Sequence, residues 1–599
     1  MSTNTDISEL FEKSADLMAV LGVNSFKVLA TRKVARLLRD CPRNVEELAS
    51  SGELDNMPGI GQHSAEKIRE YLRTGNISEF QQLAGEVPPG VLAMMNISGL
   101  GVKTAALFWR EAGITTMDEL RRRLDDGSLL NLPGMGAKKL AKIKENLAYS
   151  TGQANRRRIG EALPIARDFC QLLQAIPGIV RTTFCGSLRR GRETIGDIDI
   201  LVCSDAPVHQ QIHTAVGRHP QVAQLLAVGE TKISFRTNLD MQVDIRVVPT
   251  PSWGAAMQYF TGSKEHNVRL REMATVKALK LNEWGLFAGD TAIAGETEEG
   301  IYEALGLAWI PPEMREDRGE VTLAQNMLSH APAQLKAAFP FLADAPSTWQ
   351  TLQVADIRGD LHTHTIASDG TCTIAEMVAA AKHRGYEYIA ITDHSKSQFQ
   401  ANGLSSQRLL DHIAAIHAVA REVHGIRVLA GAEVDILADG SLDYEDDLLR
   451  KLDWVIASPH AALSQETDAA TTRLVRAASH PLVHVLGHPT GRLVGKRRGL
   501  EPDMPRVVMA ALRSGVALEI NANDMRLDLR DTHVRLAVEA GVPLCINTDA
   551  HSIEDFSQID YGVLTARRGW ARKANILNTR SGVQLEQWMQ ARRQSDEWR

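Results

Sequence analysis

The chain has 599 residues, of which 44% are hydrophobic and 23% charged, and its formal net charge is −6. This length predicts several domains, and the mild acidity excludes a broadly basic protein, so a nucleic-acid partner would have to be held by local positive patches. No apolar run is long enough to cross a membrane, the first residues are unlike a secretory signal and the six cysteines are scattered, which together predict a cytoplasmic protein with reduced thiols.

Three short glycine turns recur early in the chain, at MPGIGQ from Met57, ISGLGV from Ile97 and LPGMGA from Leu132. Each is expected to open a helix, whose free N–H groups and positive dipole end suit a phosphate. One such turn could equally be an ordinary link between helices, but three at similar spacing favour helix-hairpin-helix elements that grip the DNA backbone without reading its sequence. The candidate DNA-binding residues are Gly59, Gly61, Lys67, Gly99, Gly101, Gly134 and Gly136.

Strand-like and helix-like runs alternate from about Leu163 to Pro312, and one strand carries two carboxylates. Asp197 and Asp199 are one residue apart in GDIDIL, so their side chains point to the same face, and Asp244 in MQVDIRVV can supply a third. Clustered carboxylates suit Mg²⁺, and two such ions favour in-line transfer of a nucleotide with loss of pyrophosphate. Donors for a triphosphate lie upstream in GSLRRGR, at Gly186, Ser187 and Arg190.

This set, with YFTGS from Tyr259, resembles the nucleotidyltransferase palm of the family X DNA polymerases, the DNA polymerase beta-like repair enzymes. The resemblance covers residues 1 to about 317. It implies that Asp197, Asp199 and Asp244 bind Mg²⁺, and that Asp244 also receives the proton of the primer hydroxyl. It also implies gapped or nicked duplex DNA, with its 3′ ends, and dNTPs as partners.

The same resemblance implies a nucleotide site around the triad. The phosphates are expected at the glycine turn and its arginine, the sugar at YFTG, and the base and template beside the helix that follows. The implied residues are Gly186, Ser187, Arg190, Gly196, Tyr259, Phe260, Gly262, Asn267 and Arg271 for the nucleotide, and Lys232 for the primer strand.

Three positions depart from relatives. Gln242 replaces an arginine beside the third aspartate, while His63 and Thr31 replace a lysine and a tyrosine of those relatives that act as lyases. A lyase needs a lysine that forms a Schiff base. Because the supporting residues are changed, Lys67 is expected to contact a phosphate rather than to form that bond.

Seven short apolar runs in the last 240 residues each stop at a polar side chain. They read IRGDLHTH, YIAITDHS, RVLAGAEVD, LDWVIASPH, VHVLGHP, ALEINAN and PLCINTDAH, with helical stretches such as TIAEMVAAAKHRG between them. Strand, ligand and helix in this order predict a β/α barrel whose active site gathers at the C-terminal ends of its strands. The candidate metal ligands are His362, His364, Asp369, His394, Glu433, His460, His488, Asp549 and His551.

Imidazole with carboxylate and no thiolate favours Mn²⁺, Zn²⁺ or Fe²⁺, and so many ligands imply two or three ions and hydrolysis of a phosphoester. The pattern resembles the PHP (polymerase and histidinol phosphatase) domain over residues 356 to about 575, which implies a distorted seven-stranded barrel. Asp393 is expected to orient a ligand or water. The stretches 491–499 and 521–531 are candidates for holding a DNA strand, although a solvated loop is as good an interpretation.

Both resemblances, in this order, are those of bacterial family X DNA polymerases with a C-terminal PHP domain. They imply a monomeric enzyme of DNA repair, including base excision repair, that fills short gaps on a template. The barrel would act as a 3′→5′ exonuclease with Mn²⁺ or Zn²⁺, and cleavage at abasic sites is a further expected activity. Two alternatives stay open: a small-molecule phosphatase fused to the polymerase, and a DNA-end-binding scaffold with both sites inactive.

The expected architecture is a multidomain α and α/β chain, N-terminal helix-hairpin-helix domains being followed by a palm with thumb and a distorted (β/α)7 barrel. The expected parts are an N-terminal helical DNA-binding domain (1–85), a fingers-type helix-hairpin-helix domain (86–160), the palm (161–250), a nucleotide-selecting C-terminal polymerase subdomain (251–318), a linker (319–355), the PHP domain (356–575) and a C-terminal tail (576–599).

Overall fold

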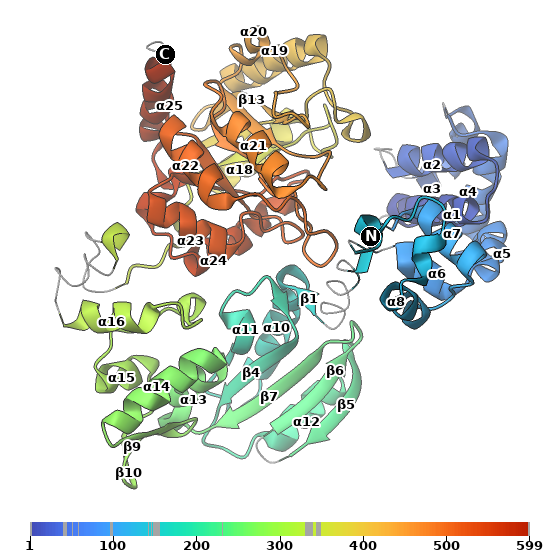
Figure 1. Cartoon of the computed structure of the whole chain (residues 1–599). Helices are drawn as coiled ribbons and strands as arrows, with labels where there is room; N and C mark the ends of the chain where they lie inside the picture. The colour runs from blue at the N-terminus through green and yellow to red at the C-terminus, as the bar shows by residue number, and fades with distance from the viewer. Residues whose placement is uncertain are drawn as a thin grey trace. The chain divides into compact units, whose positions relative to one another are not determined.

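The computed structural model describes residues 3–39, 45–50, 52–57, 59–95, 97, 100–141, 143–144, 147, 156–229, 232–329, 339–342 and 349–596. The chain divides into two compact units (Figure 1), formed by residues 1–154 with 495–497 and by residues 155–494 with 498–599. Among the described residues, no helix combines the length and the apolar character that a membrane span requires.

In the first unit, every secondary-structure element of residues 1–154 that the structure describes is a helix (blue in Figure 1). Two apolar clusters stabilise it, one around Phe11 and Phe80, whose rings meet edge to face at 5.0 Å, and one around Phe108 and Leu120. The helices are α1 (Thr3–Val20), α2 (Ser25–Arg39), α3 (Val45–Ser50), α4 (Gln62–Thr74), α5 (Ser78–Glu86), α6 (Pro89–Met95), α7 (Val102–Ala112) and α8 (Met117–Asp125).

A five-stranded sheet in the order β2-β4-β7-β6-β5 opens the second unit. Strands β4 and β7 are parallel and the other neighbours antiparallel. Along β4 the side chains alternate, so Ile198 and Ile200 enter the core while Asp197 and Asp199 take the opposite face. The strands are β2 (Arg181–Phe184), β4 (Asp197–Cys203), β5 (Val222–Val228), β6 (Lys232–Thr237) and β7 (Gln242–Val248); β1 (Arg157–Arg158) and β3 (Thr194–Ile195) form a separate pair, and the helices are α10 (Ile159–Gln174), α11 (Gly186–Arg189) and α12 (His209–Gly217).

A smaller subdomain follows the sheet and has its own core around the fully buried Tyr302. Helix α16 lies in the segment that was predicted to be a partly packed linker, and Val321, Leu323 and Met327 are buried in that core. The start of the predicted linker is therefore packed. The elements are α13 (Trp253–Thr261), α14 (Lys264–Val276), β8 (Lys280–Asn282), β9 (Gly285–Ala288), β10 (Thr291–Ala294), α15 (Glu298–Leu305) and α16 (Glu320–Leu328).

Seven parallel strands form the C-terminal barrel in the order β11-β12-β13-β14-β15-β16-β17, as the seven apolar runs predicted. The last strand returns to the first through a parallel bridge between Thr363 and Ala550, which confirms the barrel. The strands are β11 (Gly359–Thr363), β12 (Tyr388–Ile391), β13 (Arg427–Asp435), β14 (Trp454–Ser458), β15 (Val485–Leu486), β16 (Ala517–Asn521) and β17 (Leu544–Asn547).

Helices cover the barrel (Figure 1), and the segment that was predicted to be a tail joins them. Leu577, Leu585 and Met589 lie in the apolar cluster with Trp454 and Tyr388. Residues from the segment 576–596 therefore take part in the barrel's packing. The helices are α18 (Ile374–His383), α19 (Ser406–Glu422), α20 (Asp446–Leu449), α21 (Thr467–Ala478), α22 (Met504–Ser514), α23 (Asp531–Ala540), α24 (Ile559–Arg568) and α25 (Gly582–Asp596).

Candidate active sites

Three carboxylates lie together at one end of the parallel pair β4 and β7. Asp199 is directly opposite Asp244 in the register, and Asp197 is two residues earlier on the same face as Asp199. Gly186 lies against this end of the strands with a φ of +63°, and a Cβ atom there would lie 2.6 Å from Asp199 Oδ2. The start of α11 thus approaches the triad as closely as only glycine permits.

The three carboxylates of the triad repel one another, and the nearby cations offset this repulsion only in part. Burial, and then the charges of Asp197 and Asp244, raise the pKa of Asp199 to about 7. Burial would likewise raise the pKa of Asp244, but hydrogen bonds from Lys232, Ser234 and Gln242 lower it. Lys232 Nζ lies 2.8 Å from Asp244 Oδ2. A cation held by carboxylate oxygens would remove this repulsion, so the donor set fits a hard divalent ion such as Mg²⁺.

Several of the predicted nucleotide residues converge beside the triad. A Cβ on Gly262 would lie 3.1 Å from Arg190 Nη1, so YFTG meets the arginine of GSLRRGR. The rings of Tyr259 and Phe260 meet edge to face at 5.2 Å. Asn267 Nδ2 donates to the carbonyl oxygen of Tyr259 at 2.7 Å.

The remaining predicted nucleotide-binding residues differ in their exposure and surroundings. Ser187 is half-buried on α11, and Gly196 immediately precedes Asp197, with Arg156 Nη1 3.0 Å from the position of an added Cβ. Arg271 is exposed on α14.

In the first unit, the glycine turns begin helices as predicted. Gly61 and Gly101 are the N-caps of α4 and α7, and neither helix start has a side-chain cap, so its first N–H groups are not satisfied by a side chain. Gly59 and Gly134 take positive φ angles of +92° and +72°. At the third turn, the amide of Leu140 donates to the carbonyl of Gly136, as at the start of a helix.

Two residues of the predicted DNA-binding set need separate mention. Gly99 lies outside the described residues. Lys67 is 8% exposed, and its ammonium group pairs with Glu79 Oε2 at 2.6 Å. In the structure Lys67 is therefore held by a carboxylate of α5.

All nine predicted barrel ligands lie at the C-terminal ends of strands or in the loops that follow. Their donor atoms form three overlapping groups, within each of which all atoms are less than 4.8 Å apart: His364, Asp369, His394 and His551; His362, His364, Glu433 and Asp549; His394, Glu433 and His460. His488, the ninth, places Nε2 2.8 Å from Glu433 Oε1. Because the groups share members, the arrangement can hold more than one ion.

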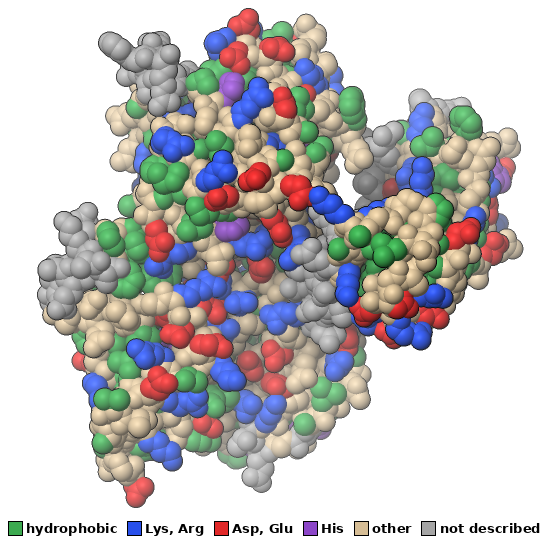
Figure 2. Space-filling view, viewed as in Figure 1, with side chains coloured by type: hydrophobic (Ala, Val, Ile, Leu, Met, Phe, Trp, Pro, Cys, Tyr) green, Lys and Arg blue, Asp and Glu red, His purple; other side chains and the backbone are tan. Residues whose placement is uncertain are grey.

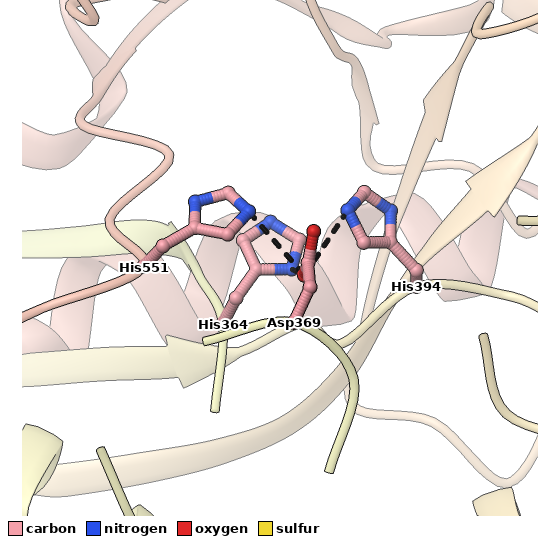
Figure 3. Close-up of side chains that lie close together, drawn as sticks. All are labelled: His364, Asp369, His394 and His551. Carbon is pink, nitrogen blue, oxygen red and sulfur yellow. Dashed lines mark ion pairs between the residues drawn. The ribbon is translucent and has the colours of Figure 1, made fainter. Parts of the chain in front are cut away.

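Figure 3 shows the most open of these groups. Asp369 lies between two histidines, with Oδ1 3.5 Å from His394 Nε2 and 3.4 Å from His551 Nε2. The other two groups are deeper, since Glu433 and His362 are almost completely buried. Asp549 adopts a φ of +56°, a conformation unusual for a non-glycine residue and common at functional sites.

Unsatisfied atoms show that this cluster fits a metal centre. A buried polar atom ordinarily has a hydrogen-bond partner, and its absence needs a cause. Burial, and then His551 and His394, lower the pKa of His364 to about 4, which keeps it in the neutral form that binds metals. The buried atoms without a hydrogen bond are His362 Nε2, both ring nitrogens of His364, His394 Nδ1, His460 Nε2, His488 Nδ1, Glu433 Oε2 and Asp549 Oδ1.

Two carboxylates that were not predicted from the sequence contact ring nitrogens of the ligand histidines. Glu519, on β16, lies 2.7 Å from His362 Nδ1 and accepts the backbone N–H of His488 at 2.8 Å. Asp435 accepts a hydrogen bond from His460 Nδ1. Such partners fix the ring orientation and raise the basicity of the nitrogen that faces a metal.

Asp393, which was expected to orient a ligand or water, is bonded to the loop between β11 and α18 and to a histidine of α19. It accepts hydrogen bonds from the backbone N–H groups of Thr365 and Ser368 at 2.9 and 3.1 Å, and His412 Nε2 lies 2.7 Å away. Asp369 follows Ser368 directly, so Asp393 fixes the loop that presents this ligand. From the 521–531 stretch, Arg526 Nε reaches to 3.3 Å of Asp549 Oδ2.

Family models match five parts of the chain. They are the helix-hairpin-helix domain (residues 2–77), the SAM-like helix-hairpin-helix tandem (91–148), the DNA polymerase beta palm (161–246), the DNA polymerase beta thumb (256–316) and the PHP domain (360–521).

Curated relatives match either the whole chain or its first half. The DNA polymerase/3′-5′ exonuclease PolX of Bacillus subtilis is 36% identical over 98% of this chain and 99% of its own length. DNA polymerase lambda of Rattus norvegicus is 27% identical over 52% of this chain and 56% of its own length. The DNA-directed DNA/RNA polymerase mu of Homo sapiens is 26% identical over 52% of this chain and 69% of its own length.

Proposed function

Because the chain belongs to the PolX family of DNA polymerases/3′-5′ exonucleases, we propose that its palm extends a DNA 3′ end on a template and its barrel removes 3′-terminal nucleotides. The observation that carries the proposal is the presence of two separate ligand clusters in the second unit. One is the carboxylate triad of β4 and β7, and the other is the nine-residue cluster at the barrel mouth.

In the polymerase site, Asp197, Asp199 and Asp244 would hold Mg²⁺, which supplies charge neutralisation for the phosphates and polarisation of the primer hydroxyl. Asp244 has a lowered pKa and is therefore ionised at neutral pH, so its carboxylate can accept the proton of that hydroxyl. Ser187 and Arg190 would bind the β- and γ-phosphates, and the missing side chain of Gly186 lets the start of α11, which carries Ser187, lie close to Asp199.

The residues around Tyr259 would select the nucleotide. Tyr259, Phe260 and Gly262 would line the sugar pocket, and Asn267 would meet the base because its bond to the Tyr259 carbonyl holds it beside that pocket. Arg271 would contact the template side, and Lys232, paired with Asp244, would lie near the primer strand. A polymerase of this kind fills short gaps in DNA repair, and we place it in the cytoplasm.

In the barrel, the three overlapping groups would hold two or three Mn²⁺ or Zn²⁺ ions, which supply polarisation of a phosphodiester and acidification of water. Glu519 and Asp435 orient His362 and His460 for this. Arg526 lies beside Asp549, where its guanidinium can pair with the phosphate that precedes the 3′-terminal nucleotide.

DNA would be held by backbone contacts rather than by a broad positive surface. Figure 2 shows basic and acidic side chains interspersed over the face in view. Local donors such as the uncapped starts of α4 and α7 suit this, since they bind phosphates without reading bases.

The test uses a duplex with a short gap and a 3′-labelled primer, with Mg²⁺ and Mn²⁺ varied separately. Extension with dNTPs and release of labelled mononucleotides without them are the expected results. A small-molecule phosphatase would instead release inorganic phosphate from a simple phosphomonoester and leave the primer intact. An inactive scaffold would bind the gapped duplex and change neither end.

A further inference from the structure

Arg568, the last residue of barrel helix α24, reaches into the polymerase half. Its side chain is 4% exposed, and it donates to the carbonyl oxygen of Arg190 at 2.7 Å and to Glu316 Oε1 at 2.9 Å. A third bond, to Asp531 Oδ2 at 2.7 Å, ties it to the barrel. A buried arginine with three acceptors has a fixed orientation.

Glu316 connects Arg568 to the guanidinium group of Arg190. Its Oε1 accepts a hydrogen bond from Arg190 Nε at 3.1 Å, and Arg192 Nη1 lies 3.4 Å from its Oε2. Arg190 Nη1 donates to the carbonyl oxygen of Thr261. Arg190 Nη2 has no such bond among the described residues, so this donor can meet a ligand.

The packing beneath this network keeps α24 against the loop that carries Arg190. Leu564 is one turn before Arg568 and joins Tyr561 in packing against the apolar core of the palm. A Cβ on Gly191 would lie 3.1 Å from Leu564 Cβ, so the loop and the helix touch closely.

The network also carries excess positive charge. Four guanidinium groups face two carboxylates, so positive charge is in excess within this network, beside the predicted site of the triphosphate. The groups are Arg190, Arg192, Arg318 and Arg568, with Glu316 and Asp531.

We propose that Arg568 is a positioning residue for the polymerase reaction, supplied by the barrel, which fixes Arg190 and Glu316 in the arrangement that receives the triphosphate of the incoming nucleotide. The inference rests on the proposed role of Arg190. It makes the exonuclease barrel a structural part of the nucleotide site, in addition to its own reaction.

The test compares steady-state gap filling by the full chain with Arg568→Ala, Arg568→Lys and Arg567→Ala. Arg567 is the matched control, since it lies on the same helix and bonds to Glu313 Oε1 and the Leu352 carbonyl. We expect Arg568→Ala to raise KM for the dNTP about tenfold, the effect of losing a hydrogen bond to a charged group, with a smaller change in kcat. The KM of Arg568→Lys should lie between those of Arg568→Ala and the unchanged chain, because one ammonium cannot reach all three acceptors. The KM of Arg567→Ala should stay within about twofold of that of the unchanged chain.

Release of mononucleotides by the barrel should persist in Arg568→Ala and reports that the chain is folded. If Arg568→Ala does not fold, Arg568→Lys carries the test, and a KM equal to that of the unchanged chain overturns the inference. An equal rise of KM in Arg567→Ala would also overturn it, because the effect would then belong to the domain contact as a whole. Arg190→Ala separates the two proposals: if it leaves KM unchanged, the role of Arg190 fails, whereas if it raises KM and Arg568→Ala does not, only the present inference fails.

Discussion

Replacing Glu519 by Gln tests how the barrel holds its ligands. Four donors converge on this buried carboxylate: His362 Nδ1 and Asn547 Nδ2 on Oε1, at 2.7 and 2.9 Å, and the His488 N–H and Asn521 Nδ2 on Oε2, at 2.8 and 3.3 Å. An amide offers one oxygen only, so in either orientation its NH₂ group faces two donors.

The expected loss follows from this mismatch. A buried donor left without an acceptor costs about 1–3 kcal/mol, and removal of such an outer partner commonly weakens metal binding about 10- to 100-fold. We therefore expect the Mn²⁺ concentration for half-maximal release of mononucleotides to rise about 10- to 100-fold, while primer extension in Mg²⁺ stays unchanged. The measurement is a Mn²⁺ titration of degradation of a 3′-labelled primer.

Glu320→Gln is the matched control, because Glu320 is also a buried glutamate that lies 2.7 Å from a histidine, His266, but far from the ligand cluster in sequence and in a different core. A Mn²⁺ midpoint that moves less than about twofold in Glu519→Gln, or equally in both variants, would refute the account of how His362 is oriented.

Three further predictions concern single residues. Gly186→Ala should reduce primer extension at least about tenfold because its Cβ would lie 2.6 Å from Asp199 Oδ2, whereas Gly289→Ala, also at positive φ but with nothing within 4 Å, should not; equal extension by both variants would show that the close approach is unimportant. Arg526→Ala should raise KM of the exonuclease for DNA about tenfold, and Arg526→Lys should raise it by less. An unchanged KM in Arg526→Ala would show that Arg526 does not contact the DNA. Burial raises the pKa of Asp531, but Arg568 and Arg318 lower it further, to about 2. The ionised Asp531 carboxylate therefore stabilises the fold fully above about pH 4, and this contribution is lost as the pH falls towards 2. Asp531→Asn should therefore lower the free energy of unfolding by up to about 2 kcal/mol at pH 7, measured by denaturant titration. The free energies of unfolding of the variant and the unchanged chain should become equal near pH 2, and a difference that does not change with pH would contradict this.

The strand pattern predicted the barrel well because each strand ends in the residue that its position requires. His362, His394 and His460 follow apolar runs, and parallel strands bring their C-terminal ends to one mouth. The same logic placed Asp244 opposite Asp199. These features depend on local alternation, which the sequence contains.

Residues that act through another residue were harder to predict. Glu519 is a lone carboxylate in the apolar strand ALEIN, and this position was the available signal, since a charge that is buried with its strand needs a partner. Leu585 and Met589, four residues apart, likewise indicated a packed helical face where a tail was predicted. No local pattern marks Arg568, because its partners Arg190 and Glu316 are more than 250 residues away.

The central claim is that two separate sites act on one DNA 3′ end in opposite directions. The most direct measurement follows a labelled primer in a gapped duplex with Asp199→Ala and with His364→Ala. The account predicts that Asp199→Ala degrades the primer but does not extend it, and that His364→Ala extends it but does not degrade it. If either variant loses both activities while remaining folded, or keeps both, the assignment of separate sites is contradicted.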